Sequence, residues 1–492
     1  MAPSTTRTFK DILAEYEPVI GLEVHCQLLT QTKLFCGCRN RFGDEPNSNV
    51  CPVCLGLPGA LPVLNRHAVT LAMRAALATG CAVQELSVFA RKNYFYPDLP
   101  KGYQISQYEE PLARDGVVEI PAGDGFRPVR VQRIHMEEDA GKLLHEGFAW
   151  SGEKSGVDLN RSGVPLVEIV THPDLRTSEE AHDYLTALKA LLLYAEVSDC
   201  NMEEGSLRCD ANVSVRKRGA EALGTRAEIK NLNSFKNVAR AIDHEVARQV
   251  ALLESGGEVV QETRLFDANK GETATMRSKE DAHDYRYFPE PDLPPLVVGA
   301  DWLEQTRGSL PELPAQRRSR FVKEHGLPDY DAGVLTFARD VADYFEAVAK
   351  ASGNAKAASN WVMNEVLRKL KVDDKPLGEC KVRPDGLAEM IRLIDGGTIS
   401  GKIAKDVFEK MWAGGEGPAA IVEREGLAQV SDEGALEARV AEVIAASPEQ
   451  VDSYKKGRTA ALGWFVGQVM KKTGGKANPG VVNALLKKAL DS

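Results

Sequence analysis

Four cysteines stand close together in the sequence, in two pairs whose spacing could hold a metal ion. Cys36 and Cys38 form a CxC pair, and Cys51 and Cys54 form a CxxC pair after twelve intervening residues. Both pairs lie in turn-rich sequence, and tetrahedral zinc is bound by four thiolates supplied in two such pairs. The pattern therefore predicts a structural zinc site. The alternative is a group of four buried thiols without a ligand.

A second group of chemically active side chains lies on one predicted strand, residues 19–28. Its apolar residues alternate with polar ones, so that Glu23, His25 and Gln27 share a face of the strand. A carboxylate beside an imidazole could hold a metal ion. The alternative is a polar strand face that is simply exposed to solvent, as is common in antiparallel sheets.

The same alternation recurs in two later segments. Arg208, Asp210 and Asn212 share the polar face of residues 206–216, while Glu228 and Lys230 share a face of residues 225–230. Acidic side chains can hold magnesium while cationic side chains hold phosphates, which is the division of labour that phosphoryl transfer requires. These segments predict a sheet with acids and cations mixed on one face.

Further acids stand out by their context. Glu168 lies within the apolar run VPLVEIV, residues 164–170, where an unpaired carboxylate would be costly to bury, so it needs a metal ion or a lysine as its partner. The run HMEED, residues 135–139, places three acids beside an imidazole. Its two interpretations are a metal-binding cluster and an exposed acidic turn, and the pattern alone does not separate them.

Two familiar catalytic motifs are excluded. The stretch GGTISGKI, residues 396–403, is close to a GxxxxGK[ST] phosphate loop, but Ile403 occupies the position of the magnesium-binding hydroxyl, and a helix is predicted before it instead of a strand. A turn between two helices explains these glycines. The sequence has no Gly-Ser-rich amidase stretch and no cysteine in a glutaminase context. Ammonia for any amide chemistry must therefore come from elsewhere.

The elements that must position these residues divide the chain into three predicted domains. Residues 1–295 are strand-rich and contain two clear helices, one from Asn65 to Gly80 and one that begins at Thr177, which predicts an α+β domain with a mixed or antiparallel sheet. The proline-dense segment 288–296 marks a change in composition. Residues 296–413 have helical periodicity and predict an all-α domain, and residues 414–492 predict a small α-helical tail.

Charge separates the tail from the rest of the chain. The net charge of -10 argues against a chain coated in basic surface, which is the usual sign of non-specific nucleic-acid binding. Residues 453–490, in contrast, contain no acid and the cations Lys455, Lys456, Arg458, Lys471, Lys472, Lys476, Lys487 and Lys488. This basic tail predicts either a local RNA contact or a solvated helix face.

The composition predicts a cytoplasmic protein. No stretch approaches about 20 consecutive apolar residues, and residues 1–10 lack the apolar core of a signal peptide, so neither membrane insertion nor secretion is indicated. Nine cysteines in such a protein are not a disulfide framework, because the cytosol keeps thiols reduced.

Longer strings carry a family resemblance. In order, the chain contains IGLEVHCQL (20–28), NYFYPDLPKGYQISQ (93–107), HMEEDAGK (135–142), DLNRSGVPLVEIV (158–170), MEEGSLRCDANVSVR (202–216), EIKNLNS (228–234) and DYRYFPEPDLPPL (284–296). LPDYDAGVLT, SNWV, SGKIAKDVF and GQVMKKTGGKANP follow between residues 327 and 479. This set resembles the motifs of the B subunits of Asp/Glu-tRNA(Asn/Gln) amidotransferases, the GatB family, over essentially the whole chain.

The resemblance implies an activity and its site. The expected reaction is ATP-dependent phosphorylation of the side-chain carboxylate of misacylated Glu-tRNA(Gln) or Asp-tRNA(Asn), followed by amidation with ammonia. It implies a cradle domain with a kinase-like ATP site over residues 1–295, a helical domain, and a tail that contacts the tRNA elbow. The zinc-binding insertion at about 36–54 is predicted from the four cysteines of this sequence. The candidate magnesium ligands carried over by motif are Glu23, His25, Glu138, Glu168 and Glu228. Catalytic candidates are Glu23, His25, Asp210 and Lys230.

The resemblance also implies partners. These are an amidase-type A subunit that hydrolyses glutamine, a small C subunit, the misacylated tRNA and the cognate non-discriminating aminoacyl-tRNA synthetase. ATP is the expected substrate, Mg²⁺ the expected catalytic metal and Zn²⁺ the structural one. Whether the physiological substrate is Glu-tRNA, Asp-tRNA or both stays open, because that depends on the synthetases of the cell.

The residues by themselves leave two other classes open. One is a zinc-ribbon RNA-binding module without chemistry, for which the cysteines and the basic tail would suffice. The other is a stand-alone metal-dependent hydrolase that uses Glu23, His25 and Glu168. Phosphate release that needs both ATP and aminoacyl-tRNA separates the three classes, since the module releases none and the hydrolase needs no ATP.

Overall fold

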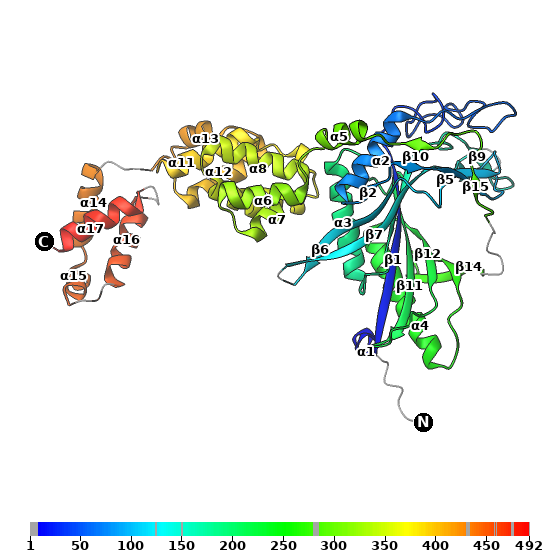
Figure 1. The fold of residues 1–492 in the computed structure, drawn as a ribbon. Coiled ribbons are helices and arrows are strands. Elements are labelled where there is room, and N and C mark those ends of the chain that lie inside the picture. The colour runs from blue at the N-terminus through cyan, green and yellow to red at the C-terminus, as the bar shows by residue number, and fades with distance from the viewer. Residues whose placement is uncertain are drawn as a thin grey trace. The chain divides into compact units, whose positions relative to one another are not determined.

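The chain forms two compact units in the computed structural model, Met1–Pro314 and Ala315–Ser492 (Figure 1). The structure describes residues 8–123, 125–148, 151–278, 285–429, 433–456, 458, 460–473 and 477–491. Among these residues, no helix has both the length and the apolar composition needed to cross a membrane. The predicted class is confirmed, since a mixed sheet with inserted helices is followed by a helical region.

The centre of the first unit is a nine-stranded sheet within the described residues, in the order β14-β13-β12-β11-β1-β10-β7-β6-β2. All neighbouring strands are antiparallel except β12 and β13. The strands are β1 (Tyr16–Gln27), β2 (Ala82–Val83), β6 (Ala113–Ala122), β7 (Gly125–Glu138), β10 (Pro165–Thr171), β11 (Leu207–Lys217), β12 (Ala227–Leu232), β13 (Glu262–Asp267) and β14 (Glu272–Ser278).

Among the described residues, three helices pack on the apolar face of this sheet. The two predicted helices are α2 (Arg66–Ala78), capped by the Asn65 side chain, and α3 (Ser178–Tyr194), capped by Thr177. The long helix α4 (Phe235–Glu254) packs beside α3. This helix was not predicted from the sequence. Apolar residues of these three helices form one core with the apolar side chains of β1 (Figure 1). The polar residues of β1 therefore face away from the core, as alternation requires.

Small β elements and two short helices complete the first unit. A three-stranded sheet joins β15 (Phe288–Pro289), β4 (Phe89–Asn93) and β5 (Tyr103–Gln107), and β5 contacts β7. Two-stranded pairs join β16 (Leu296–Val297) with β3 (Leu86–Ser87), and β8 (Lys142–Leu144) with β9 (Gly156–Asp158). The helix α1 (Phe9–Glu15) precedes β1, and α5 (Ala300–Gly308) packs on α2. The contacts thus place residues up to Pro314 with the first unit, and the domain limits at 295 and 413 stay predictions.

The second unit is helical throughout its described residues and has two separate apolar cores. The first core is formed by α6 (Pro314–His325), α7 (Asp329–Thr336), α8 (Arg339–Ser352), α9 (Ala355–Trp361), the π-helix Val362–Val366, α10 (Leu367–Asp373), α11 (Pro384–Asp395), α12 (Gly401–Gly414) and α13 (Pro418–Arg424). The second is formed by α14 (Glu433–Ala445), α15 (Pro448–Lys455), α16 (Ala460–Lys472) and α17 (Pro479–Leu490). Residues 396–400 form the predicted turn between α11 and α12, where Ser400 caps the second helix.

Candidate functional site

The polar face of the sheet carries a row of ionisable side chains across four strands. His25 of β1 lies opposite Glu168 of β10, and Glu168 lies opposite His135 of β7. On the other side, His25 lies opposite Arg208 of β11. Directly opposite residues in antiparallel strands have their side chains about 5 Å apart. Residues far apart in the sequence are therefore brought together by strand register alone.

Three of these side chains form a group that could hold a metal ion. His25 Nε2 lies 3.6 Å from Glu168 Oε2 and 3.5 Å from Glu137 Oε1. The ligand atoms of His25, Glu137 and Glu168 all lie within 4.8 Å of one another. His135 Nε2 lies 3.0 Å from Glu168 Oε2. The two carboxylates suit magnesium, which prefers oxygen ligands, and the imidazole can bind through a water molecule or orient a carboxylate.

The electrostatics of the group favour positive charge at its centre. Burial alone would lower the pKa of His135, but the Glu168 and Glu137 carboxylates outweigh burial and raise it to about 9. Burial alone would raise the pKa of Glu168, but the two histidines outweigh burial and hold that pKa well below its usual range. In addition, His135 Nδ1 is buried and has no hydrogen-bond partner among the residues that the structure describes. This donor set fits a divalent cation, which would satisfy the same carboxylates.

Glu137 was not among the magnesium ligands predicted from the sequence, which included the adjacent Glu138. The signal was available, because Glu137 lies two residues after His135 and so shares its strand face. The Glu138 carboxylate instead pairs with Lys101 and accepts a hydrogen bond from the backbone N–H of Ile105 at 2.9 Å. It thereby anchors the segment between β4 and β5. As a magnesium ligand, Glu138 stays a prediction.

A second group lies beside the first on the same sheet face. Glu23 accepts a hydrogen bond from Asn212 at 2.9 Å, and burial together with the nearby Glu168 and Glu228 carboxylates raises its pKa. Lys230 lies 2.6 Å from Asp210 and 2.8 Å from Glu228. Burial disfavours the charged form of Lys230, but Asp210 and Glu228 outweigh it and raise its pKa. The structure therefore places Glu23, Asp210, Glu228 and Lys230 in one neighbourhood.

The other flank carries a guanidinium held in a fixed orientation. Arg208 donates to both oxygens of the buried Asp139, at 2.9 and 3.0 Å, in a bidentate pair. Gln27 donates to the same carboxylate at 3.0 Å. A bidentate pair fixes the plane of the guanidinium. Arg208 also lies opposite His25 in the register of β1 and β11, so a guanidinium of fixed orientation adjoins the group that contains His25.

An aromatic wall adjoins the metal-binding group. Tyr285 and Tyr287 lie edge to face at 6.0 Å, and Tyr287 stacks on Tyr108 at 4.1 Å with an interplanar angle of 6°. Burial and the Glu137 and Glu168 carboxylates raise the pKa of Tyr287 to about 12. Lys92 of β4 lies over the Tyr285 ring with its ammonium 5.0 Å from the centroid. The closely spaced Tyr285 and Tyr287 were the signal that the sequence offered for this wall.

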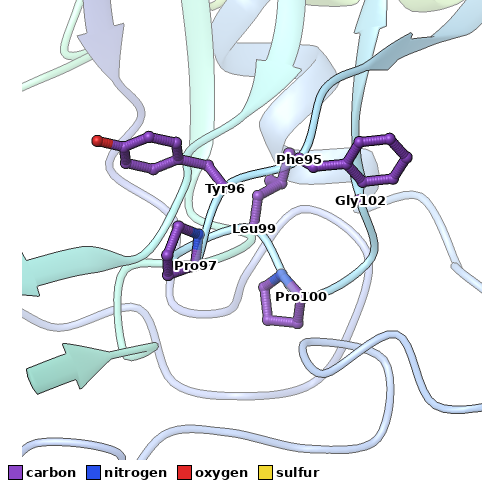
Figure 2. A pocket seen from close by; sticks show the side chains of 6 residues that line it. All are labelled: Phe95, Tyr96, Pro97, Leu99, Pro100 and Gly102. Atoms are coloured by element: carbon purple, nitrogen blue, oxygen red, sulfur yellow. The ribbon is translucent and has the colours of Figure 1, made fainter.

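The loop between β4 and β5 forms a separate pocket. A pocket of about 460 Å³ is lined by Phe95, Tyr96, Pro97, Leu99, Pro100 and Gly102. Figure 2 shows Phe95 and Tyr96 reaching in opposite directions, with Leu99 between them. Phe95 and Tyr96 are 87% and 55% exposed. The pocket therefore belongs to an open loop surface and does not contain the ionisable groups described above.

The four cysteines that were predicted to bind zinc lie close together. The Sγ atom of Cys54 lies 3.7 Å from those of Cys36 and Cys51 and 3.9 Å from that of Cys38. Four thiolates at about 2.3 Å from a tetrahedral zinc are separated from each other by about 3.8 Å. The spacing therefore fits zinc closely, and all four positions are taken by protein ligands.

A buried lysine accompanies the cysteines and was not identified from the sequence. Lys33 is fully buried, and its ammonium donates to Cys54 Sγ at 3.4 Å and to the carbonyl oxygens of Asn49 at 2.7 Å and Leu159 at 3.3 Å. A hydrogen bond from Cys36, with a contribution from Lys33, lowers the pKa of Cys54 to about 4. Lys33 therefore balances part of the negative charge of a thiolate cluster.

Comparisons with known proteins find the same family in both units of the chain. The family model described as the GatB/GatE catalytic domain matches residues 18–304, and the GatB domain model matches residues 343–490. Similar proteins, each named as the B subunit of an aspartyl/glutamyl-tRNA(Asn/Gln) amidotransferase, include those of Carboxydothermus hydrogenoformans, 56% identical over 97% of this chain and 99% of the relative, and Prosthecochloris aestuarii, 58% identical over 97% and 98%. The relative from Geobacter sulfurreducens is 57% identical over 96% and 99%.

Proposed function

The chain belongs to the GatB family, and on that premise we propose that it is the B subunit of a tRNA-dependent amidotransferase. Its substrate is misacylated Glu-tRNA(Gln), Asp-tRNA(Asn) or both. The side-chain carboxylate of the esterified amino acid takes the γ-phosphoryl group of ATP and ADP leaves. Ammonia then attacks the acyl phosphate, inorganic phosphate leaves, and the amide remains on the tRNA.

The observation that carries this proposal is the convergence of Glu137, Glu168 and His25 on one sheet face between two cationic flanks. Magnesium bound there, with Glu23 close by, would neutralise phosphate charge. Arg208 on one flank and Lys230 on the other can hold anionic oxygens in place. Phosphoryl transfer depends mainly on such positioning and charge stabilisation. A binding module without chemistry has no use for buried acids paired in this way.

The remaining parts of the proposal concern partners. The relatives are named as one subunit of an amidotransferase, and this sequence contains no amidase or glutaminase nucleophile motif. An amidase-type A subunit that supplies ammonia and a small C subunit complete the enzyme. The misacylated tRNA is the substrate, and the cognate synthetase is a further partner. As a translation enzyme, the complex works in the cytoplasm. The limits at 295 and 413 separate its cradle, helical and tail domains.

The test is ATP turnover by the complex assembled with its A and C subunits. We expect ADP to form only when misacylated tRNA is present, and the amide product to form when either glutamine or ammonium is added. Hydrolysis without ATP would support the metal-dependent hydrolase instead. Binding of tRNA without any ADP formation would support the RNA-binding module.

Arg208 provides a prediction at the cationic flank. Replacing Arg208 with glutamine should lower kcat/KM for tRNA-dependent ADP formation by about 10²-fold, as removal of one oriented donor to a developing charge does. Arg208→Lys should recover only part of this loss, because an ammonium cannot reproduce the bidentate contact with Asp139. The matched control is Arg130→Gln, which removes an exposed arginine paired with Asp174. Wild-type ADP formation by Arg208→Gln would remove this residue from the site.

A further inference from the structure

The segment that carries the four cysteines is tied by hydrogen bonds to a segment far along the chain. We call residues 36–54 the cysteine segment and residues 157–164 the connecting segment, because the latter leads directly into β10. The Asn47 side chain donates to the carbonyl oxygen of Val157 at 2.9 Å and accepts from the backbone N–H of Leu159 at 2.8 Å. A single amide of the cysteine segment thus satisfies a backbone donor and a backbone acceptor of the connecting segment.

Two further side chains join the same segments. The Asn160 side chain accepts from the backbone N–H of Asn49 at 2.8 Å and donates to a second backbone group of the cysteine segment at 2.7 Å. The buried ammonium of Lys33 donates to the carbonyl oxygens of Asn49 at 2.7 Å and Leu159 at 3.3 Å, one in each segment. We call Asn47, Asn160 and Lys33 the asparagine–lysine clamp.

The backbone at Asn47 does not by itself require an asparagine. Asn47 is exposed and has a φ of 60°, in the left-handed region. Glycine adopts this conformation more readily than any other residue, and asparagine is the next best suited. Glycine would therefore fit the turn at least as well. What glycine lacks is the amide group that reaches the connecting segment.

The connecting segment continues this line of contacts toward the sheet face that carries the ionisable groups. Arg161 donates to the carbonyl oxygens of Ala140 at 3.0 Å and Gly141 at 2.6 Å, and its Nε lies 3.7 Å from the Asp139 carboxylate. That carboxylate makes the bidentate contact with Arg208. Arg161 therefore fixes the backbone next to the residue that orients Arg208.

The connecting segment lies against residues 139–141 without space between them. The Gly163 N–H donates to the carbonyl oxygen of Asp139 at 2.9 Å. A Cβ atom added at Gly141 would lie 3.0 Å from the Asp158 carbonyl oxygen and 2.8 Å from the Leu159 side chain. A shift of the connecting segment must therefore displace the backbone of Asp139 as well, because closely packed groups transmit strain.

We propose that the asparagine–lysine clamp positions Arg208 for the phosphorylation reaction, by holding the connecting segment, and with it Asp139, against the cysteine segment. Zinc held by the four thiolates would fix the cysteine segment and so the far end of this line of contacts. The clamp side chains are positioning residues, since they act through Asp139 and Arg208. The proposal rests on the proposed function for the role of Arg208. The rival explanation is a clamp that only stabilises the fold.

The first test removes one amide of the clamp in the complete complex. Asn47→Gly keeps the left-handed turn and should lower kcat for tRNA-dependent ADP formation by about fivefold to tenfold, the usual effect of losing a supporting contact behind a functional residue. The KM for tRNA and the zinc content should stay unchanged. Asn160→Ala should behave in the same way. Ser48→Ala is the matched control, because its hydroxyl donates to the Glu45 carbonyl oxygen within the cysteine segment.

A double-mutant cycle separates positioning from stabilisation. In the Arg208→Gln background, Asn47→Gly should cause no further loss of kcat, because the residue through which it acts is already gone. A clamp that only stabilises the fold would give losses that multiply. Multiplied losses, or a wild-type kcat in both clamp variants, would overturn the proposal. If Asn160→Ala does not fold, the exposed Asn47 decides the outcome alone.

Hydrogen exchange gives a measure that needs no turnover. The backbone N–H groups of Asp139 and Gly163 pair with carbonyl oxygens across the contact between the two stretches of chain. Asn47→Gly and removal of zinc by a chelator should each speed their exchange, and Ser48→Ala should not. Unchanged exchange after zinc removal would refute the link to the cysteine segment. If the wild-type complex forms no ADP, the proposed function fails, while the exchange rates still show whether the clamp holds Asp139 in place.

Discussion

Glu168→Gln should abolish ADP formation in response to misacylated tRNA, with a loss of at least about 10³-fold, because this carboxylate has the most central position in the site. It contacts His25 at 3.6 Å and His135 at 3.0 Å and lies opposite both across the sheet. Glutamine keeps the shape but removes the charge that would hold a divalent cation and that raises the pKa of both histidines. The measurement is single-turnover ADP formation by the complex with A and C subunits.

Ammonium separates this loss from a defect in glutamine hydrolysis. Free ammonium bypasses the glutaminase but cannot bypass activation of the carboxylate, so the variant should remain inactive with ammonium while glutamine hydrolysis stays chemically intact. Glu23→Gln should behave in the same way. Glu119→Gln, an exposed residue of β6, is the control and should keep wild-type activity. Normal ammonium-driven amidation by Glu168→Gln would place the phosphorylation site elsewhere.

Cys51→Ser should reduce the zinc content of the purified protein from about one ion per chain to nearly none. All four ligand positions are filled by cysteines, which is the arrangement of a structural site. Structural zinc sites contribute roughly 10 to 16 kcal/mol in small peptides, so the loss should unfold the segment around the cysteines. We expect limited proteolysis to cut between Lys33 and Leu55 in the variant and in chelator-treated wild-type protein.

The control for the zinc experiment is another buried cysteine. Cys81 lies outside the cluster, and Cys81→Ser should keep its zinc even though it disturbs the core. Retention of a full complement of zinc by Cys51→Ser would refute the assignment. Zinc loss without any change in proteolysis would show that the metal does not hold the segment in place.

Glu137 and Glu138 show which site residues a local sequence pattern can identify. Strand alternation is a local property with a period of two, so the polar face of β1 and the helix caps at Asn65 and Thr177 were readable from the chain. Applied strictly to β7, the same rule selects Glu137, which shares the face of His135. Glu138, which the family resemblance implies as a magnesium ligand, is the next residue along β7, and its assignment stays a prediction.

The sequence by itself determined the α+β class, the cysteine pairs, the basic tail and the acids that face away from the core, because each depends on residues close together in the chain. Only the tertiary structure decided which of them meet. Register between β1, β10, β7 and β11 aligns His25 with Glu168, His135 and Arg208, and no local pattern encodes the partner of a strand or its offset. Burial of Lys33 against the cysteines and of Asp139 behind Arg208 likewise depends on contacts between distant segments. An unpaired buried charge is too costly to persist, so each buried charged side chain must have a partner. Which residue that partner is depends on the tertiary structure.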